Sequence, residues 1–152
     1  MPPKLVPITA MIRNATEADI ARLVEIRGAV RENQLRDPSR VTIEDYRWFI
    51  ANPGIFVWEE EGRIVGFSAA DPRDGSIWAL FMDPAFEGRG FARLLLERAC
   101  QVLQAAGCDR MWLTTSPGTR AEKFYRKAGW RVAGLAGDQL VFKKYSSRLP
   151  HP

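Results

Sequence analysis

The chain has 152 residues, 46% hydrophobic and 26% charged, which is typical of one globular domain of about 100–200 residues. Its net charge of +4 is spread over scattered lysines and arginines, which argues against a nucleic-acid partner and suits a small anionic ligand. The sequence has only two cysteines and one histidine, so we expect neither a disulfide framework nor a metal site. It has no apolar run near about 18 residues, so we expect no membrane span. We recognise no leader, and together these features favour a cytoplasmic protein.

Turn residues and hydrophobic periodicity divide the chain into strands and helices of ordinary length. In chain order we expect a strand at 9–15, helices at 16–33 and 42–52, two strands within 55–70, a strand at 76–83, a helix at 88–106, a strand at 110–116, a helix at 119–129, and strands at 130–135 and 139–145. Asp19, three residues after Thr16, imitates a capping box at the start of the first helix.

This order predicts an α+β fold, with a mixed but mostly antiparallel sheet of six to seven strands flanked by four helices. We expect a single domain over residues 1–152, structured from about 11 to 145, with tails at 1–8 and 146–152. The broad apolar face of the longest helix predicts that this helix packs on the sheet.

The stretch FEGRGFA precedes that helix. Glycines there let a phosphate approach the unpaired N–H groups of the first helical turn, where the helix dipole is positive. Gly88 and Gly90 provide this, Ala92 is small, and Arg89 and Arg93 add positive charge. The stretch matches neither the P-loop pattern nor the dinucleotide fingerprint. A turn that only starts a helix is the alternative interpretation.

Together with its surroundings, this stretch resembles the GNAT acyltransferase superfamily, whose members use acetyl-CoA. The family pattern of Gln or Arg, two residues, Gly, one residue, then Gly or Ala falls on Glu87, Gly90 and Ala92. The preceding LFMDP resembles the family's strand that ends in proline, and AEKFYRKAGW resembles its second block around Tyr125. The resemblance covers nearly the whole chain and is most specific over residues 77–131.

The resemblance implies a sheet splayed between its fourth and fifth strands, with the pantetheine arm of acetyl-CoA in the gap. It implies backbone contacts from Phe81 and Met82, and a pyrophosphate on the N–H groups of residues 88–92. The implied cofactor-binding residues are Phe81, Met82, Gly88, Arg89, Gly90, Phe91, Ala92, Arg93, Thr119 and Phe124. No metal is implied.

Tyr125 is the implied catalytic residue. A phenol close to the sulfur can protonate the thiolate that leaves when the tetrahedral intermediate collapses. The helical stripe shared with Phe124 by itself favours a core aromatic at both positions.

The sequence departs from the family at two positions. The fourth strand carries no Glu, so the general base stays open among five acids and a water chain to backbone carbonyls; the acids are Asp71, Asp83, Glu59, Glu60 and Glu61. Gly118 stands where relatives often have Asn, which leaves a cofactor hydrogen bond to Thr119, Ser116 or the backbone.

The resemblance therefore implies an N-acetyltransferase that passes an acetyl group directly from acetyl-CoA to a primary amine of a small molecule or peptide through a ternary complex. The acceptor would enter opposite CoA, between the first two helices and the closing hairpin, where Arg31, Arg36 and Arg40 could bind a carboxylate. The alternatives are a non-catalytic acyl-CoA-binding regulatory module and a toxin-like enzyme acting on aminoacyl-tRNA. Family members are often dimers, so a homodimer is an expectation.

Overall fold

The computed structural model describes residues 10–30, 41–88 and 90–145. Its elements are β1 (Ala10–Asn14), the 3-10 turn η1 (Glu17–Asp19), α1 (Ile20–Ala29), α2 (Ile43–Ala51), β2 (Ile55–Glu60), β3 (Arg63–Asp71), β4 (Ser76–Met82), the 3-10 turn η3 (Pro84–Phe86), α3 (Phe91–Ala105), β5 (Arg110–Thr115), α4 (Arg120–Lys127), β6 (Arg131–Ala136) and β7 (Gln139–Tyr145). The predicted α+β class and the predicted order of strands and helices are confirmed.

The strands form one sheet in the order β1-β2-β3-β4-β5-β7-β6. Every neighbouring pair is antiparallel except β4 and β5, which are parallel and share a single pair of residues, Ser76 and Trp112. In the part of the chain that the structure describes, β4 and β5 therefore meet at one end and separate along the rest of their length. This is the predicted splay.

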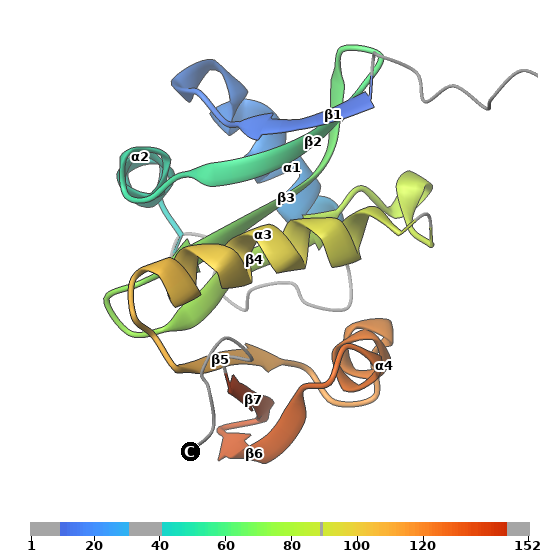
Figure 1. Ribbon diagram of the computed structural model, residues 1–152. Helices are drawn as coiled ribbons and strands as arrows, with labels where there is room; N and C mark the ends of the chain where they lie inside the picture. Colours follow the sequence, from blue (N-terminus) through green and yellow to red (C-terminus); the bar gives the residue numbers. More distant parts are fainter. Residues whose placement is uncertain (1–9, 31–40, 89, 146–152) are drawn as a thin grey trace, which may run out of the picture.

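Helices cover both faces of the sheet, with α3 in front of the strands and α1 behind them in Figure 1. Side chains alternate along β3, and that alternation separates the two faces. Phe67 is buried in a core with α1 and α2, whereas the hydroxyl of Ser68 donates to the backbone oxygen of Leu95 on α3. A second core lies between α3, β5, α4 and β7. None of the helices in the described ranges is both long enough and apolar enough to cross a membrane.

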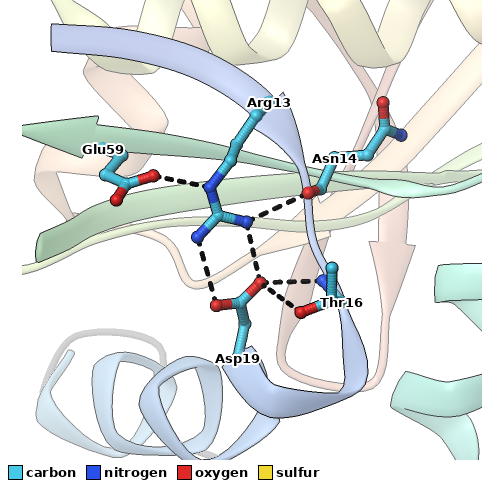
Figure 2. Close-up of polar contacts among 5 residues, drawn as sticks. All are labelled: Arg13, Asn14, Thr16, Asp19 and Glu59. Atoms are coloured by element: carbon cyan, nitrogen blue, oxygen red, sulfur yellow. Dashed lines mark hydrogen bonds and ion pairs between the residues drawn. The ribbon is translucent and has the colours of Figure 1, made fainter. Parts of the chain in front are cut away.

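The first predicted helix starts as the turn η1 and continues as α1, ending at Ala29; its predicted last residues, 31–33, lie outside the described residues. The Asp19 carboxylate accepts from the Thr16 backbone N–H at 2.7 Å and from the Arg13 guanidinium at 2.8 Å. Arg13 also donates to Glu59 on β2 (Figure 2), so one guanidinium ties η1 to two strands. These hydrogen bonds raise the pKa of Arg13 and lower the pKa of Asp19.

The longest helix begins at Phe91 and not at the predicted Gly88. Gly88 and Gly90 have φ angles of 79° and 84°, which are left-handed and incompatible with a continuous α-helix. The residues predicted to form the first turn of the helix instead form the loop before it, and Gly90 is the N-cap.

A bulge interrupts β4 near its middle. Ala69 pairs with Ala79 and Ala70 pairs with Ile77, so Trp78 is an extra residue without a partner on β3. A bulge re-aims the side chains that follow it. It therefore reverses the in–out alternation of β4 beside the splay.

Candidate active site

A cleft of about 710 Å³ lies where β4 separates from β5. It is lined from both faces of the sheet, because the end of α1 contributes Val30, and α3 and α4 contribute Ala92 and Tyr125. The complete lining is Val30, Leu80, Phe81, Met82, Glu87, Gly88, Ala92, Arg120, Ala121, Lys123, Phe124, Tyr125, Arg126 and Lys127. Six of the predicted site residues are thus brought together: Phe81, Met82, Gly88, Ala92, Phe124 and Tyr125.

The exposed backbone edge of β4 is offered by Leu80 and Met82. The N–H of Asp83 donates to the oxygen of Val65 on β3 at 2.8 Å. Because backbone N–H groups alternate between the two sides of a strand, Phe81 points its backbone toward β3, as Asp83 does. Leu80 and Met82 point theirs into the gap. Of the two predicted backbone contacts, Met82 thus faces the gap and Phe81 faces β3.

The loop before α3 presents N–H groups at the other end of the cleft. Gly88 lines the cleft and Gly90 is the N-cap of α3. An added Cβ at either glycine would meet no atom within 4 Å, so the glycines are required by their left-handed φ angles rather than by crowding. A phosphate can reach the first turn of α3 from this side. Arg89 lies outside the described residues.

Four described residues that were predicted to bind the cofactor do not line the cleft: Gly90, Phe91, Arg93 and Thr119. The ring of Phe91 stacks on Trp58, with centroids 4.5 Å apart. Arg93 is exposed and lies 3.9 Å from Glu97, one turn further along α3. Thr119 is the N-cap of α4. Contacts from Phe91 and Arg93 to a cofactor stay predictions, with the backbone N–H groups as the available donors.

The Thr119 hydroxyl stabilises the loop before α4. It accepts from the N–H of Glu122 at 3.2 Å and donates to the oxygen of Ser116 at 2.9 Å. Gly118 has a φ of 76°, and its N–H donates to the Glu122 carboxylate at 2.8 Å. Gly and Asn are the residues that adopt left-handed angles most readily. Local geometry is therefore sufficient to explain Gly at the position where relatives often have Asn.

Tyr125 lies on α4 between the cleft and the second core. It is 7% exposed and its ring contacts those of Phe124, Trp130 and Phe142. Burial raises the pKa of Tyr125, so the phenol keeps its proton at neutral pH. A protonated phenol beside the cleft can act as an acid and cannot act as a base.

The acids considered as general bases lie away from the cleft. Asp71 accepts from Arg73, and this hydrogen bond lowers the pKa of Asp71. For Asp83, burial acts to raise the pKa, but hydrogen bonds from the Ala85 N–H and from Arg22 prevail and lower it. Among the described residues that line the cleft, Glu87 is the only carboxylate.

Glu87 is an exposed residue that also lines the cleft. Its carboxylate forms an ion pair with Arg120 at the start of α4, across the mouth of the cleft. The acid before the glycine turn thus faces the basic group that an incoming phosphate would meet.

Leu80, Arg120 and Arg27 were not among the residues expected at the site. Leu80 could have been found from strand alternation, which pairs it with Met82. Arg27 carries a weaker signal, a cation on α1 one residue beyond the buried Ile26. Arg31, Arg36 and Arg40, named for the acceptor side, lie outside the described residues. Within the described ranges, no group of three or more His, Cys, Asp or Glu side chains could hold a metal ion.

Comparisons with known proteins agree with this geometry. The sequence profile of the Acetyltransferase (GNAT) family matches residues 20–130. An uncharacterized N-acetyltransferase of Mycobacterium tuberculosis strain H37Rv is 31% identical over 84 residues, which are 53% of this chain and 54% of that protein. This chain thus spans about half the length of that relative.

Two further proteins match over nearly the whole chain. A [ribosomal protein bS18]-alanine N-acetyltransferase of Haemophilus ducreyi is 29% identical over 147 residues, covering 92% of this chain and 90% of that protein. The structure of yncA from Salmonella typhimurium, solved with its cofactor acetyl-CoA, has a TM-score of 0.72 at 20% identity and covers 94% of this chain and 97% of that one. By its matched sequence and its fold, this chain belongs to the GNAT acetyltransferase family.

Proposed function

We propose that the protein transfers an acetyl group directly from acetyl-CoA to a primary amine, with both substrates bound at once. The observation that carries this proposal is the cleft between β4 and β5, which has lining residues from both faces of the sheet. Acetyl-CoA would enter from the side of α3 and α4, and the amine from the side of α1. The two reacting atoms would then meet at the open edge of β4.

The chain offers a group for each part of acetyl-CoA. The first turn of α3 would bind the pyrophosphate through backbone N–H groups. The backbone of Leu80 and Met82 would pair with the amides of the pantetheine arm, as a neighbouring strand would. A β4 N–H directed into the gap would also stabilise the oxyanion that forms on the thioester carbonyl.

The transfer needs two proton movements. The amine nitrogen attacks the thioester carbon and forms the C–N bond, and the C–S bond then breaks. The thiolate takes a proton from Tyr125, whose buried phenol is protonated at neutral pH. The amine proton leaves through water and backbone carbonyls, because no acid considered as a base lines the cleft. Solvent then restores the Tyr125 proton.

The two free cysteines support a cytoplasmic enzyme, and its acceptor is left to experiment. Both cysteines are free thiols, as is usual in a reducing compartment. The Haemophilus relative is named as an N-acetyltransferase of an alanine of ribosomal protein bS18. Peptide amines therefore belong in the first panel, beside amino acids, polyamines and aminoglycosides.

The test is release of CoA thiol from acetyl-CoA with each pool of amines, followed by the Tyr125→Phe variant. We expect turnover with at least one pool, and a kcat lowered about 10²- to 10⁴-fold in the variant, because proton transfer is lost while packing is kept. The KM for acetyl-CoA should change less than about twofold, since the phenol acts mainly in the transition state.

Tyr145→Phe is the matched control, because Tyr145 is 66% exposed at the end of β7 and does not line the cleft. It should keep wild-type kinetics. Unchanged kcat in Tyr125→Phe would remove its role as the acid. Tight binding of acetyl-CoA without turnover of any amine would favour the non-catalytic acyl-CoA-binding module instead.

A further inference from the structure

Arg27 on α1 is a half-buried cation, and two of its three guanidinium nitrogens lack an acceptor among the residues that the structure describes. Its Nε and Nη1 atoms are buried and have no hydrogen-bond partner among the residues that the structure describes. Its guanidinium carbon lies 4.6 Å from the ring centroid of Phe81 and 5.0 Å from that of Trp78. Arg27 as a residue is only partly buried, and a carboxylate would reach these two nitrogens once the side chains that cover them shift.

Such an arrangement is costly unless something else binds there. Cation–π contacts recover part of the lost hydration of a guanidinium. They do not satisfy its N–H groups, and a buried donor without an acceptor keeps its full desolvation penalty. Elsewhere on the same helix, Arg22 is satisfied by Ile64 and Asp83. Arg27 therefore stands out as a cation prepared for an anion that the described protein does not supply.

The position of Arg27 relates it to the candidate active site. Val30, one turn further along α1, and Phe81, which contacts the guanidinium, both line the cleft. In a regular strand, side chains three positions apart point to opposite faces of the sheet. The bulge at Trp78 instead places its ring on the same face as Phe81, at the core with α1 and α2. The guanidinium thus lies on the α1 side of the sheet, against the rings of Trp78 and Phe81, and it adjoins the cleft through Phe81 without lining it.

We propose that Arg27 binds a carboxylate of the acceptor, so that the substrate is a small amine that carries a carboxylate, such as a free amino acid. This inference rests on the proposed function, because it places the acceptor on the α1 side of the acetyl-CoA cleft. A guanidinium between rings prefers a carboxylate, which matches it in charge and forms charge-assisted hydrogen bonds. The amine of an amino acid then extends toward Leu80 and Met82.

The experiment compares the twenty free amino acids with their twenty C-terminal amides in the CoA-release assay. The wild-type enzyme should acetylate one or more acids with a kcat/KM at least about 30-fold above that of the matching amide, the size expected for a buried charged pair. In Arg27→Met, which keeps the length and apolar contact of the side chain, this preference should fall to about one. The KM for acetyl-CoA should stay within about twofold of wild type.

Arg27→Lys keeps the charge without the guanidinium fork, and an intermediate preference is expected. Arg98→Met, an exposed site on α3, should leave the preference intact. If Arg27→Met does not fold, the inference is tested by the preference of the wild type for acids over amides and by the reduced preference expected in Arg27→Lys. Equal turnover of acids and amides by the wild type overturns this inference and leaves the acetyltransferase proposal standing. Failure of all amines, including peptides and polyamines, overturns both.

Discussion

At the scale of single residues, the surroundings of a side chain decide which chemistry it can perform. Tyr125 is packed among aromatic rings, and this burial raises its pKa, so the phenol is protonated at neutral pH. Asp71 and Asp83 have lowered pKa values beside arginines, and both are poor bases at neutral pH. Glu87 lines the cleft, but its carboxylate is held in an ion pair with Arg120, close to where the phosphates of acetyl-CoA would bind. The described lining thus provides a protonated phenol and an ion-paired carboxylate, and the proposed mechanism passes the amine proton to water.

Asp19 provides a prediction about stability and pH. Hydrogen bonds from Arg13 and from Thr16 lower its pKa despite partial burial. A carboxyl with a lowered folded pKa contributes stability above its unfolded value near pH 3.9, and this contribution is lost as the pH falls through the folded value. Asp19→Asn should therefore lower the free energy of unfolding by about 1–2 kcal/mol at pH 7.

The difference between Asp19→Asn and wild type should shrink below about pH 4, as followed by urea unfolding from pH 7 to pH 2.5. Asp109→Asn, at an exposed position before β5, is the control and should match the wild type throughout. A difference that stays constant across this range would show that Asp19 acts through its shape and not through its charge.

At the scale of elements, β4 connects the two faces of the sheet. Its first residue pairs with β5, its bulge changes the direction of its side chains, and its last residues face the cleft. Its other edge is held by β3, where Gly66 opposes Met82. A Cβ at Gly66 would lie 2.3 Å from the sulfur of Met82 and 3.1 Å from the backbone oxygen of Phe81. Gly66 is thus the residue that leaves room for the edge of β4.

Gly66→Ala should lower the free energy of unfolding by about 1–3 kcal/mol, because overpacking forces Met82 out of its place. It should also raise the KM for acetyl-CoA, since Met82 lines the cleft. In a Met82→Ala background, where the obstructing sulfur is gone, the same glycine substitution should cost clearly less. Equal costs in both backgrounds, measured by urea unfolding, would mean that the backbone contact with Phe81 dominates.

At the scale of the whole molecule, direct strand pairing between β4 and β5 is sparse. One core lies between α1, α2 and strands β2 to β4, whereas the other lies between α3, α4, β5 and β7 and also takes Ala70 of β3 and Ile77 of β4. Only Ser76 and Trp112 pair across the boundary between β4 and β5 in the described residues. A ligand in the cleft would contact both sides of this boundary, and so would replace missing strand pairing with its own backbone-like amides.

Acetyl-CoA should therefore stabilise the protein as a whole. At about 100 times the dissociation constant, binding to the folded state alone adds roughly 2.7 kcal/mol. This should raise the Tm by about 5–10 °C for a chain of this size. Hydrogen exchange should slow most in β4 and β5. ADP, which lacks the pantetheine arm, is the control. Equal protection by ADP at matched saturation would show that bridging of the gap contributes little.

The order of strands and helices, the glycine turn before α3 and the acidic cap at Asp19 could all be predicted from the sequence. Each depends on residues close together in the chain, through periodicity, left-handed φ angles or a hydrogen bond over three positions. The approximate place of the cleft could also be predicted, because the two short motifs resemble a family whose sheet is splayed between its fourth and fifth strands. The start of α3 was predicted three residues early, since helical periodicity does not register the dihedral angles of Gly88 and Gly90.

Only the tertiary structure decided which groups meet. The bulge at Trp78 requires the register with β3, and the burial of Arg27 requires α1 to pack behind β4. The pairing of Glu87 with Arg120 joins residues 33 positions apart. Local sequence determines how each segment folds because backbone dihedral preferences act within a few residues. The chemistry of the site depends on burial and on charges brought together from distant segments, and these exist only once the sheet has formed.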